Sequence, residues 1–438
     1  MSAIATDLVE RIWQRDATLW TSQDEARWLG WLDEPLRMLE QLDEINDFAR
    51  DVISPGAIDD VVVLGMGGSS LAPEVLRRAF GADRFHVLDT THPKTIRALE
   101  ERIDVERTLF LSASKSGSTL ETRSHTAYFL EKGGSFAAIT DPGSDLERFA
   151  REQGFLHVFH GEPTIGGRYS ALSPFGIVPA VFMSVDVAHL LERAQEMRDA
   201  CRLAEGNPGL ELGLRLADAS SVGLSENPYG FGLWVEQLIA ESTGKEGKGI
   251  LPAPDDPAAE LQEEVRLPDP YELGQEFFRW EFAVAVAGSL IGINPFDQPN
   301  VQAAKDKTNE VLAQGDVELE PEGSLEELLA QARDGDYVCI QAFTDYARVD
   351  ELEAIVQRAR AAGHVVTHGF GPRYLHSTGQ FHKGGPDNGL FLQVVDDTGD
   401  ELPIPGQEFG FARLIRAQAA GDYESLKARG RRVARVRI

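Results

Sequence analysis

Short apolar runs alternate with longer amphipathic stretches from about residue 60 onward. The early runs are rich in β-branched and aromatic residues and predict buried strands at 61–64, 85–89, 108–113, 136–140 and 156–159. Stretches of roughly fifteen residues with helical periodicity separate them. This alternation predicts a parallel sheet with helices on both faces. Residues 1–50, rich in Leu, Trp and Glu, predict a helical segment that precedes the sheet.

A second α/β unit is predicted for the rest of the chain. Its clearest strand patterns come late, at 337–341, 364–368 and 390–395. The acidic, proline-rich stretch Asp255–Pro270 predicts an exposed loop. We therefore expect an α/β protein with two parallel sheets flanked by helices. Its expected divisions are a helical segment 1–50, a first domain 51–215, and a second domain 216–438 with a C-terminal strand and loop extension.

Composition narrows the class of protein. The 438 residues are 42% hydrophobic and 26% charged, which is typical of a globular protein. No run approaches the ~20 apolar residues of a membrane span, and the N-terminus carries no basic segment leading into an apolar one. Cys201 and Cys339 are the two cysteines, so we expect no disulfide framework. A cytoplasmic protein without a membrane partner is the interpretation that fits.

Net charge restricts the partners. A formal charge of −29 argues against nucleic acid. The same field repels an anionic substrate, so any phosphate site needs a local concentration of lysine, arginine and backbone donors.

One such concentration follows the run 108–113. Ser114, Lys115, Ser116, Ser118 and Thr119 bring hydroxyls and one cation to the predicted N-terminus of a helix. Hydroxyls and free backbone N–H groups at such a position favour a phosphate monoester. The spacing is not that of a nucleotide P-loop. A serine-rich turn that only caps the helix is the alternative.

A glycine-rich turn, Gly65–Pro73, follows the run 61–64. Its glycines allow close backbone approach to a ligand, and we expect a sugar or phosphate near Gly68 and Ser69. Ser70 stands where a dinucleotide fingerprint has its last glycine, so a nucleotide is disfavoured. The alternative is a tight turn without a ligand.

Arg168 and Glu241 are the candidates for acid–base chemistry. Two glycines, Gly166 and Gly167, precede Arg168 and allow its guanidinium to be aimed at negative charge that develops on a substrate. A solvated surface arginine is the alternative. Glu241 falls on the apolar face of a helical pattern, where lost hydration raises a carboxyl pKa towards that of a general base. The alternative is a structural ion pair with Lys245 or Lys248.

Two further segments carry polar candidates. Lys305 lies on the less polar face of the helix predicted after Pro299, where a lysine needs an anion. Between two predicted strands, the loop 369–385 holds His376 and His382. These histidines are six residues apart with no carboxylate between them, so we predict no metal site.

Together these segments resemble the phosphoglucose isomerase family. The matching pieces are Gly65–Pro73, Ser114–Thr122, Gly166–Ser170, Glu241–Gly249 and Asn294–Lys305, and they run in the family's order. The loop 369–385 resembles that of the isomerase half of bifunctional transaldolase/phosphoglucose isomerases. The resemblance implies two sugar-isomerase (SIS-type) domains, a hexose 6-phosphate substrate, no cofactor and a homodimer. It also implies reversible isomerisation of glucose 6-phosphate and fructose 6-phosphate through a cis-enediol.

The resemblance further implies roles for single residues. Ser114, Lys115, Ser116 and Thr119 would hold the phosphate, and Gly68 and Ser69 would line the sugar. Arg168 would stabilise the enediolate, and Glu241 would move the proton between C1 and C2. The complete set of candidates is Gly68, Ser69, Ser114, Lys115, Ser116, Ser118, Thr119, Glu121, Gly167 and Gln298 for binding, and Arg168, Glu241, Lys305, His376 and His382 for catalysis.

One departure from the family concerns ring opening. The family uses a histidine placed after the glutamate motif, whereas no histidine lies between His189 and His364 here. Ring opening is then expected from Lys305 and water, or from His376 or His382. A dual glucose/mannose 6-phosphate isomerase and a non-catalytic sugar-phosphate-binding protein are the alternative functions. The absence of a basic DNA-binding helix disfavours a regulator, and the joint presence of Arg168, Glu241 and Lys305 favours an enzyme.

Overall fold

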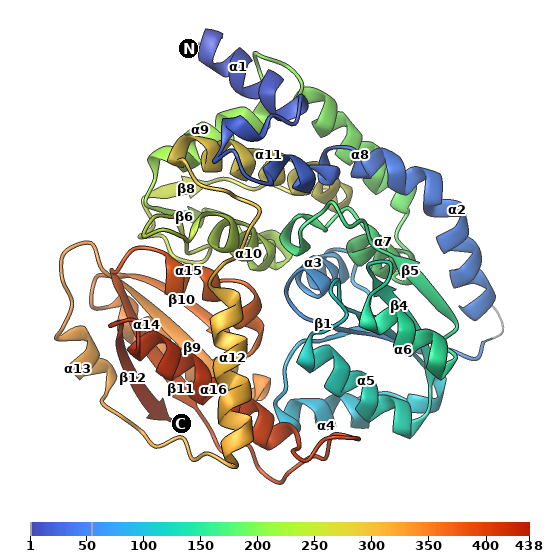
Figure 1. The fold of residues 1–438 in the computed structure, drawn as a ribbon, viewed down its shortest axis with the longest axis vertical. Helices are drawn as coiled ribbons and strands as arrows, with labels where there is room; N and C mark the ends of the chain where they lie inside the picture. Colours follow the sequence, from blue (N-terminus) through green and yellow to red (C-terminus); the bar gives the residue numbers. More distant parts are fainter. Residues whose placement is uncertain (1, 54–55) are drawn as a thin grey trace.

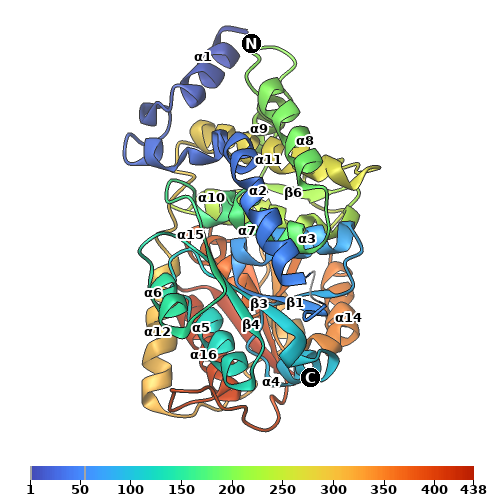
Figure 2. The same cartoon turned by 90° about the vertical axis from the view of Figure 1, so that its right-hand side faces the viewer.

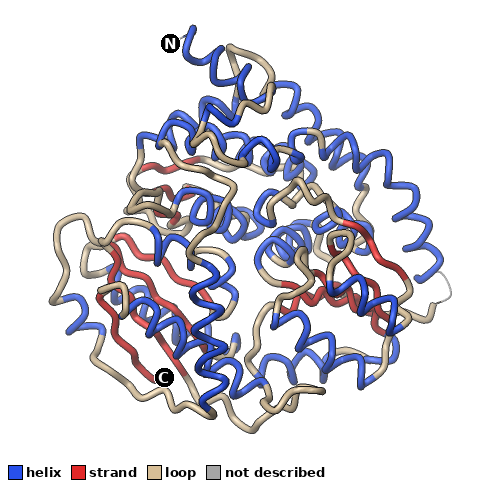
Figure 3. Tube along the Cα trace, viewed as in Figure 1, coloured by secondary structure: helices blue, strands red, loops and turns tan. Residues whose placement is uncertain are grey.

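Parallel sheets form the frame of the protein (Figures 1 and 3). The computed structural model describes residues 2–53 and 56–438, without the side chains of residues 2–5 and 301–305. In this part of the chain there are three sheets, with strand orders β2-β1-β3-β4-β5, β10-β9-β11-β12 and β7-β6-β8. The strands are β1 Asp60–Gly65, β2 Phe85–Leu88, β3 Thr108–Ala113, β4 Ser135–Thr140, β5 His157–His160, β6 Ser221–Leu224, β7 Leu251–Pro252, β8 Leu261–Glu263, β9 Tyr337–Phe343, β10 Val365–Phe370, β11 Gly389–Val395 and β12 Arg432–Arg437.

Helices cover these sheets and form a separate layer above them. Their bounds are α1 Ser2–Trp13, α2 Glu34–Ile53, α3 Leu71–Ala79, α4 Pro93–Arg102, α5 Leu120–Lys132, α6 Asp145–Gln153, α7 Pro174–Phe182, α8 Val187–Ala200, α9 Pro208–Asp218, α10 Gly232–Thr243, α11 Leu273–Ile291, α12 Val301–Gln314, α13 Leu325–Leu329, α14 Val349–Arg360, α15 Gly379–Gly384 and α16 Phe411–Lys427. Short 3₁₀ turns connect several of them, among them η2 Glu25–Trp28, η3 Gly30–Leu32, η4 Gly67–Ser69, η6 Gly167–Tyr169 and η10 Arg373–His376.

The first sheet is apolar on both faces. Val61 and Val63 of β1 point into a core shared with the N-terminal helices, while Val62 and Leu64 point into a second core on the opposite face. Helices on both faces exclude water from every position of the strand, so the sequence reads as a continuous apolar run. All five strands predicted before residue 160 are present, each within one residue of its predicted ends.

The helical layer lies above the sheets. In it α11 packs on α8 and α9, with α1 at the outer end (Figure 1). α2 packs against α7 and α8 and leads from this layer towards the first sheet (Figure 2). The prediction of a helical segment at the N-terminus is therefore confirmed. No helix in the described part of the chain is long and apolar enough to span a membrane.

The later half holds two sheets, the small one of β6–β8 and the four-stranded one of β9–β12. The three predicted late strands are present as β9, β10 and β11. The prediction of an exposed loop at 255–270 is wrong in part, because the segment contains β8 and buries Val265. Its Asp256 is also buried, and its carboxylate accepts a hydrogen bond of 2.7 Å from the backbone N–H of Val366 in β10.

The C-terminal part also packs against the first sheet. Phe411 and Leu414 of α16 join Val62, Leu64 and Phe110 in one apolar cluster. The carboxyl ends of the first sheet's strands therefore face groups from residues 340–420 as well as their own loops.

Candidate active site

A cavity of about 640 Å³ opens where β1 and β3 end. Such a position, at the carboxyl ends of parallel strands, is where open α/β sheets bind ligands. Its walls come from segments far apart in sequence, namely Asp24, Arg27, Trp28, Met66, Gly67, Gly68, Ser69, Lys115, Ser116, Thr119, Asp141, Pro163, Gly166, Gly167, Arg168, Gln237, Glu241, Phe296, Asp297, Gln298, Pro299 and His376. Ten of the fifteen predicted site residues therefore line one cavity.

The hydroxyl loop after β3 forms one end of the cavity. Ser116 and Thr119 line it, whereas Ser114 is buried behind and its hydroxyl donates to Thr119 Oγ1 at 3.0 Å. Ser118 is exposed and lies 2.9 Å from the Ser116 hydroxyl. Gly117 has a φ of +70°, which a residue with a side chain adopts only with strain. The loop thus presents Ser116 and Thr119, with Ser114 and Ser118 as their supports.

Lys115 lines the same end but is held by protein groups. Its Nζ donates to both carboxylate oxygens of Asp141, at 2.8 and 2.7 Å, and to the carbonyl of Glu162 at 2.8 Å. Burial lowers the pKa of Lys115 and raises that of Asp141. An ammonium has three N–H donors, so these contacts occupy them all.

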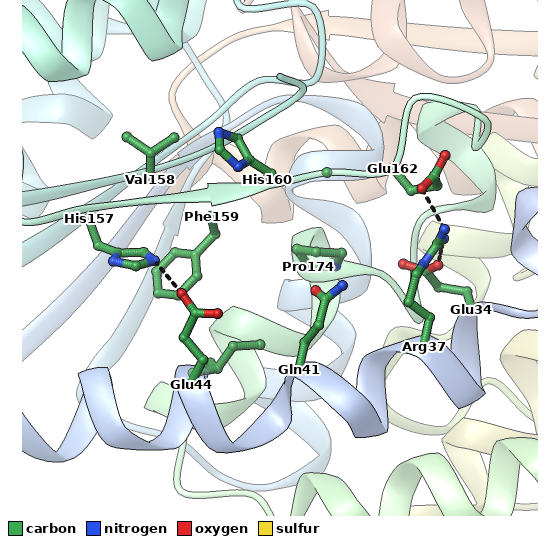
Figure 4. A pocket seen from close by; sticks show the side chains of 12 residues that line it. Glu34, Arg37, Gln41, Glu44, His157, Val158, Phe159, His160, Glu162 and Pro174 are labelled. Atoms are coloured by element: carbon green, nitrogen blue, oxygen red, sulfur yellow. Dashed lines mark hydrogen bonds and ion pairs between the residues drawn. The ribbon is translucent and has the colours of Figure 1, made fainter. Parts of the chain in front are cut away.

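A second, smaller cavity of about 320 Å³ lies behind this support (Figure 4). Arg37 of α2 stands between Glu34 and Glu162 there, and its Nη1 donates to Glu162 Oε2 at 2.5 Å. Because the carbonyl of Glu162 holds Lys115, this contact ties α2 to the hydroxyl loop. The contact between Arg37 and Glu162 at the smaller cavity therefore helps to position the hydroxyl loop of the larger cavity.

Arg168 is almost completely buried and fixed by four hydrogen bonds. Nε donates to Ser242, Nη1 to Gln298 Oε1, and Nη2 to the carbonyls of Pro295 and Asp297, all within 2.7 to 2.9 Å. Its exposed fraction of 1% excludes a solvated surface arginine. Gly68 allows this placement, because a Cβ there would lie 1.9 Å from the carbonyl oxygen of Gly167.

Glu241 faces Arg168 across the cavity. Its Oε2 lies 3.6 Å from Arg168 Nη1 and accepts a hydrogen bond of 3.1 Å from Gln237 Nε2. Burial raises the pKa of Glu241, against the opposing influence of Arg168 and of the Gln237 hydrogen bond. A raised pKa prepares a carboxylate for general base work near neutral pH.

Lys245 and Lys248, the alternative partners of Glu241, bind elsewhere. Lys245 Nζ is buried and donates to the carbonyl of Asn294 at 2.7 Å, and to the carbonyl and carboxylate of Asp297, each at 2.6 Å. Burial lowers the pKa of Lys245 to about 8. Lys248 is exposed and donates to the carbonyls of Ile291 and Gly292. A structural pair of Glu241 with either lysine is therefore absent from the described contacts.

His376 also lines the cavity, and it comes from the C-terminal part of the chain. Its Nε2 lies 2.9 Å from Oε1 of Glu121, and its carbonyl accepts a hydrogen bond of 2.9 Å from Gln237. Glu121 is buried and does not line the cavity, and its contact with His376 connects it to the cavity wall. Gln237 thus contacts both candidate proton-transfer groups, His376 and Glu241.

The structure corrects the assignment of His382. Its side chain is 2% exposed and lies in the core of the C-terminal sheet, 3.2 Å from Gln341 Nε2 and 3.4 Å from Cys339 Sγ. Burial and the neighbouring charges of Lys383 and Arg431 hold the pKa of His382 well below its ordinary value. It does not reach the cavity. Lys305 lies on α12, but its side chain is outside the described residues.

Sequence patterns do not identify several residues of the site. Gln237 stands four residues before Glu241 on one helix, a spacing that could have identified it. Ser242 and Asp297 position Arg168 and Lys245. Asp24, Arg27 and Trp28 belong to a segment predicted only as helical, and no motif there indicates a site. Among the described side chains, no group of three or more His, Cys, Asp or Glu could hold a metal ion.

Comparison with known proteins finds similarity to phosphoglucose isomerases. Residues 36–211 match the family model for phosphoglucose isomerase. The chain is 32% identical over 268 residues to glucose-6-phosphate isomerase of Trichormus variabilis, covering 51% of this chain and 50% of that protein. It is 24% identical over 385 residues to a probable glucose-6-phosphate isomerase of Methanococcus maripaludis, covering 66% of this chain and 86% of that protein.

A solved structure supports the fold. The crystal structure of a glucose-6-phosphate isomerase from Chlamydia trachomatis matches with a TM-score of 0.53 and 20% identity, over 70% of this chain and 78% of that one. The expected α/β class with parallel sheets flanked by helices is thereby confirmed. The chain spans about half the length of the first curated relatives that it matches. Over residues 36–211 the chain is thus similar to the phosphoglucose isomerase family, and over about half of its length it is similar to glucose-6-phosphate isomerases.

Proposed function

We propose that this protein interconverts glucose 6-phosphate and fructose 6-phosphate through a cis-enediol intermediate. One observation carries the proposal: the buried Glu241 carboxylate and the Arg168 guanidinium face each other at 3.6 Å in the cavity that the hydroxyl loop lines. Aldose–ketose exchange needs one base and one stabiliser of negative charge beside a held substrate. The family match and the names of the curated relatives support the same reaction.

Glu241 is the base in this proposal. It takes the proton from C2 of the open-chain aldose, the C2–H electron pair forms the C1–C2 double bond, and the C1 carbonyl electrons move onto O1. The proton of the C2 hydroxyl passes to O1, C2=O forms, and the C1–C2 electron pair takes the proton back from the same carboxyl group at C1, which gives the ketose. Its raised pKa suits both steps, because a group that takes and returns a proton works best when its pKa is near the operating pH.

Arg168 stabilises the enediolate oxygen. The developing charge faces Nη1, the nitrogen nearest to Glu241, while Nε and Nη2 stay fixed by Ser242 and the carbonyls of Pro295 and Asp297. Because these hydrogen bonds fix the guanidinium before the reaction begins, it does not have to move as the charge develops. Gln298, which accepts from Nη1, is placed to contact the same end of the substrate. Lys305 contacts the end of the substrate that carries the ring oxygen, and the resemblance alone supports this role.

At the other end, Ser116 and Thr119 bind the phosphate with their hydroxyls, supported by Ser114 and Ser118. Gly68 and Ser69 line the sugar. Lys115 contributes its charge from its place beside Asp141 rather than as a free ammonium.

We further propose that His376 opens the sugar ring. Its position in the cavity supports this role, and Glu121 holds Nε2 so that Nδ1 is left for proton transfer at the ring oxygen. A second ring-opening candidate, His382, is not proposed again, because it lies outside the cavity.

The domain division at residue 215, a homodimer and a cytoplasmic location also remain proposals. The sequence pattern, the resemblance and the absence of a membrane-spanning helix in the described part of the chain support them.

A coupled assay that converts fructose 6-phosphate to glucose 6-phosphate tests the function. We expect turnover by the parent and a loss of about 10³-fold in kcat for Glu241→Gln, with an unchanged melting temperature. Absence of turnover in the parent contradicts the function, and full activity of Glu241→Gln contradicts the base assignment. Mannose 6-phosphate, run in parallel, separates a dual-specificity isomerase from a specific one.

A further inference from the structure

Most of the charged groups that line the substrate cavity are held in ion pairs. Arg168 pairs with Glu241, and Lys115 pairs with Asp141. Asp297 pairs with Lys245, which lies directly behind the wall. Among the described lining side chains, Arg27 is the lysine or arginine that has no ion pair and no hydrogen bond in the structure. A hexose 6-phosphate brings a charge near −2 into this balance, in a chain whose formal charge is −29.

Arg27 is exposed but not loosely placed. It belongs to η2, and its guanidinium carbon lies 5.0 Å from the ring centroid of Trp28. Trp28 is fixed in turn, because its indole Nε1 donates to Asp24 Oδ2 at 2.9 Å. Asp24 Oδ1 accepts from Asn294 Nδ2 at 3.3 Å. Asp24, three residues before Arg27, is therefore engaged by Trp28 and by the loop that carries Gln298.

The segment that carries Arg27 is seated directly on the active-site loops. The backbone N–H of Gly30 donates to the carbonyl of Thr164 at 3.2 Å. A Cβ at Gly30 would lie 2.1 Å from Thr164 Oγ1, so a side chain at this position would displace Thr164. The buried Glu25 closes the turn by accepting from the backbone N–H groups of Thr21 and Gln23. The contact of Gly30 holds this segment beside Thr164, next to Pro163 of the cavity wall, and the contact of Asp24 with Asn294 holds it on the loop that carries Gln298.

From this arrangement we infer that Arg27 is the countercharge for the substrate's phosphate, an inference that rests on the proposed function. The ring of Trp28 supports one face of the guanidinium and leaves its N–H edge for the anion. An arginine edge binds two phosphate oxygens at once, which the hydroxyls of Ser116 and Thr119 complement. Lys115 cannot take this part, because Asp141 and Glu162 occupy its three donors.

Steady-state kinetics on Arg27→Gln test the inference. We expect KM for fructose 6-phosphate to rise about tenfold while kcat stays within about twofold, because the phosphate contact is the same in ground and transition states. Inhibition by inorganic phosphate weakens by the same factor. Arg27→Lys keeps the charge without the two-pronged edge, so its KM lies between those of the parent and Arg27→Gln.

Arg102→Gln is the matched control. Arg102 is an exposed arginine of α4 with no ion pair in the structure and outside this cavity, so its loss changes the net charge equally. An equal rise of KM in Arg102→Gln overturns the inference, because the effect then belongs to the general field. Unchanged KM and unchanged phosphate inhibition in Arg27→Gln overturn it as well.

The test separates failure of the inference from failure of the proposed function. If the parent shows no turnover, the proposed function fails, and titration calorimetry with inorganic phosphate still compares the parent with Arg27→Gln. Equal phosphate affinities of the two proteins then overturn the role of Arg27. About tenfold weaker binding by Arg27→Gln supports it.

Discussion

The pKa of Glu241 is set by burial, which raises it, and by neighbouring groups, which lower it. Burial favours the neutral acid and raises its pKa, whereas Arg168 and the amide of Gln237 favour the carboxylate. Burial is the largest influence, so the group keeps a pKa above the ordinary carboxyl value of 4.5. In the proposed reaction Glu241 acts as a base in its ionised form, so we expect activity to rise with pH through this raised pKa.

Gln237→Leu tests that balance. The substitution removes the hydrogen bond that stabilises the Glu241 carboxylate, so the pKa rises further and the acid limb of kcat/KM moves to higher pH. We expect a shift of about one pH unit, measured from pH 4 to 9. Glu236→Gln is the control, because it lies on the same helix but outside the cavity. An acid limb that stays in place, or moves towards lower pH, contradicts the assignment.

Arg168→Lys tests the geometry of the charge stabiliser. A lysine retains the charge but cannot make the four hydrogen bonds to Ser242, Gln298, Pro295 and Asp297. We expect kcat to fall about 10²-fold, with a smaller change in KM. Steady-state kinetics measure the split, and a change confined to KM would show that Arg168 binds the ground state instead.

At this scale the sequence was informative where a motif carried the chemistry. Arg168, Glu241 and the hydroxyl loop meet in one cavity as their motifs predict. His376 and His382 stand six residues apart in one polar loop, and the pattern cannot tell them apart. Only the packing of α15 against β9, which places His382 beside Cys339 and Gln341, separates the two roles.

At the scale of elements, the buried Lys245 joins the end of α10 to the loop 294–298. Its buried ammonium donates to the carbonyls of Asn294 and Asp297 and to the Asp297 carboxylate, which take the place of hydrating water. The same loop supplies two carbonyls and Gln298 to Arg168. The placement of Arg168 therefore depends on Lys245, although Lys245 does not line the cavity.

Lys245→Met tests this dependence. Removing the ammonium leaves buried carbonyls without a donor, so we expect a loss of stability of about 3 kcal/mol and a lower melting temperature by calorimetry. We also expect kcat to fall, because the loop that fixes Arg168 loses its anchor. Lys248→Met is the control, since Lys248 is exposed on the same turn. Equal behaviour of the two variants contradicts a specific role for Lys245.

Strands were easier to predict than loops, for a physical reason. Val61, Val62, Val63 and Leu64 are buried on both faces, so every position of the strand is apolar and the run is unmistakable. The segment 255–270 is acidic and rich in proline, yet Asp256 is buried. Its carboxylate accepts a hydrogen bond from the backbone of Val366, more than a hundred residues away. Such a contact has no signature within the segment itself.

Over the whole molecule, the cavity is assembled from residues 24 to 376 of the chain. The N-terminal turn η2, the loops of the first sheet, α10 and η10 each provide one wall. Local patterns predict the loops of the first sheet and the position of Glu241, but the contribution of Arg27 and the placement of His376 depend on contacts across the chain. The C-terminal part is held on the first sheet by α16, whose Gln418 accepts from Thr91 at 2.6 Å and donates to Glu121 at 2.7 Å.

Gln418→Leu tests whether this contact places His376. The substitution removes a hydrogen-bond partner of Glu121, which holds His376, so we expect a lower melting temperature and about tenfold slower turnover from the cyclic sugar. Gln393→Leu is the matched control, because the buried Gln393 bonds to Ala419 and Arg435 within the C-terminal part. Both variants lose stability, but only Gln418→Leu slows ring opening, while isomerisation of the open-chain form stays near the parent's rate in both. Equal kinetic losses in the two variants would mean that Gln418 contributes to stability alone.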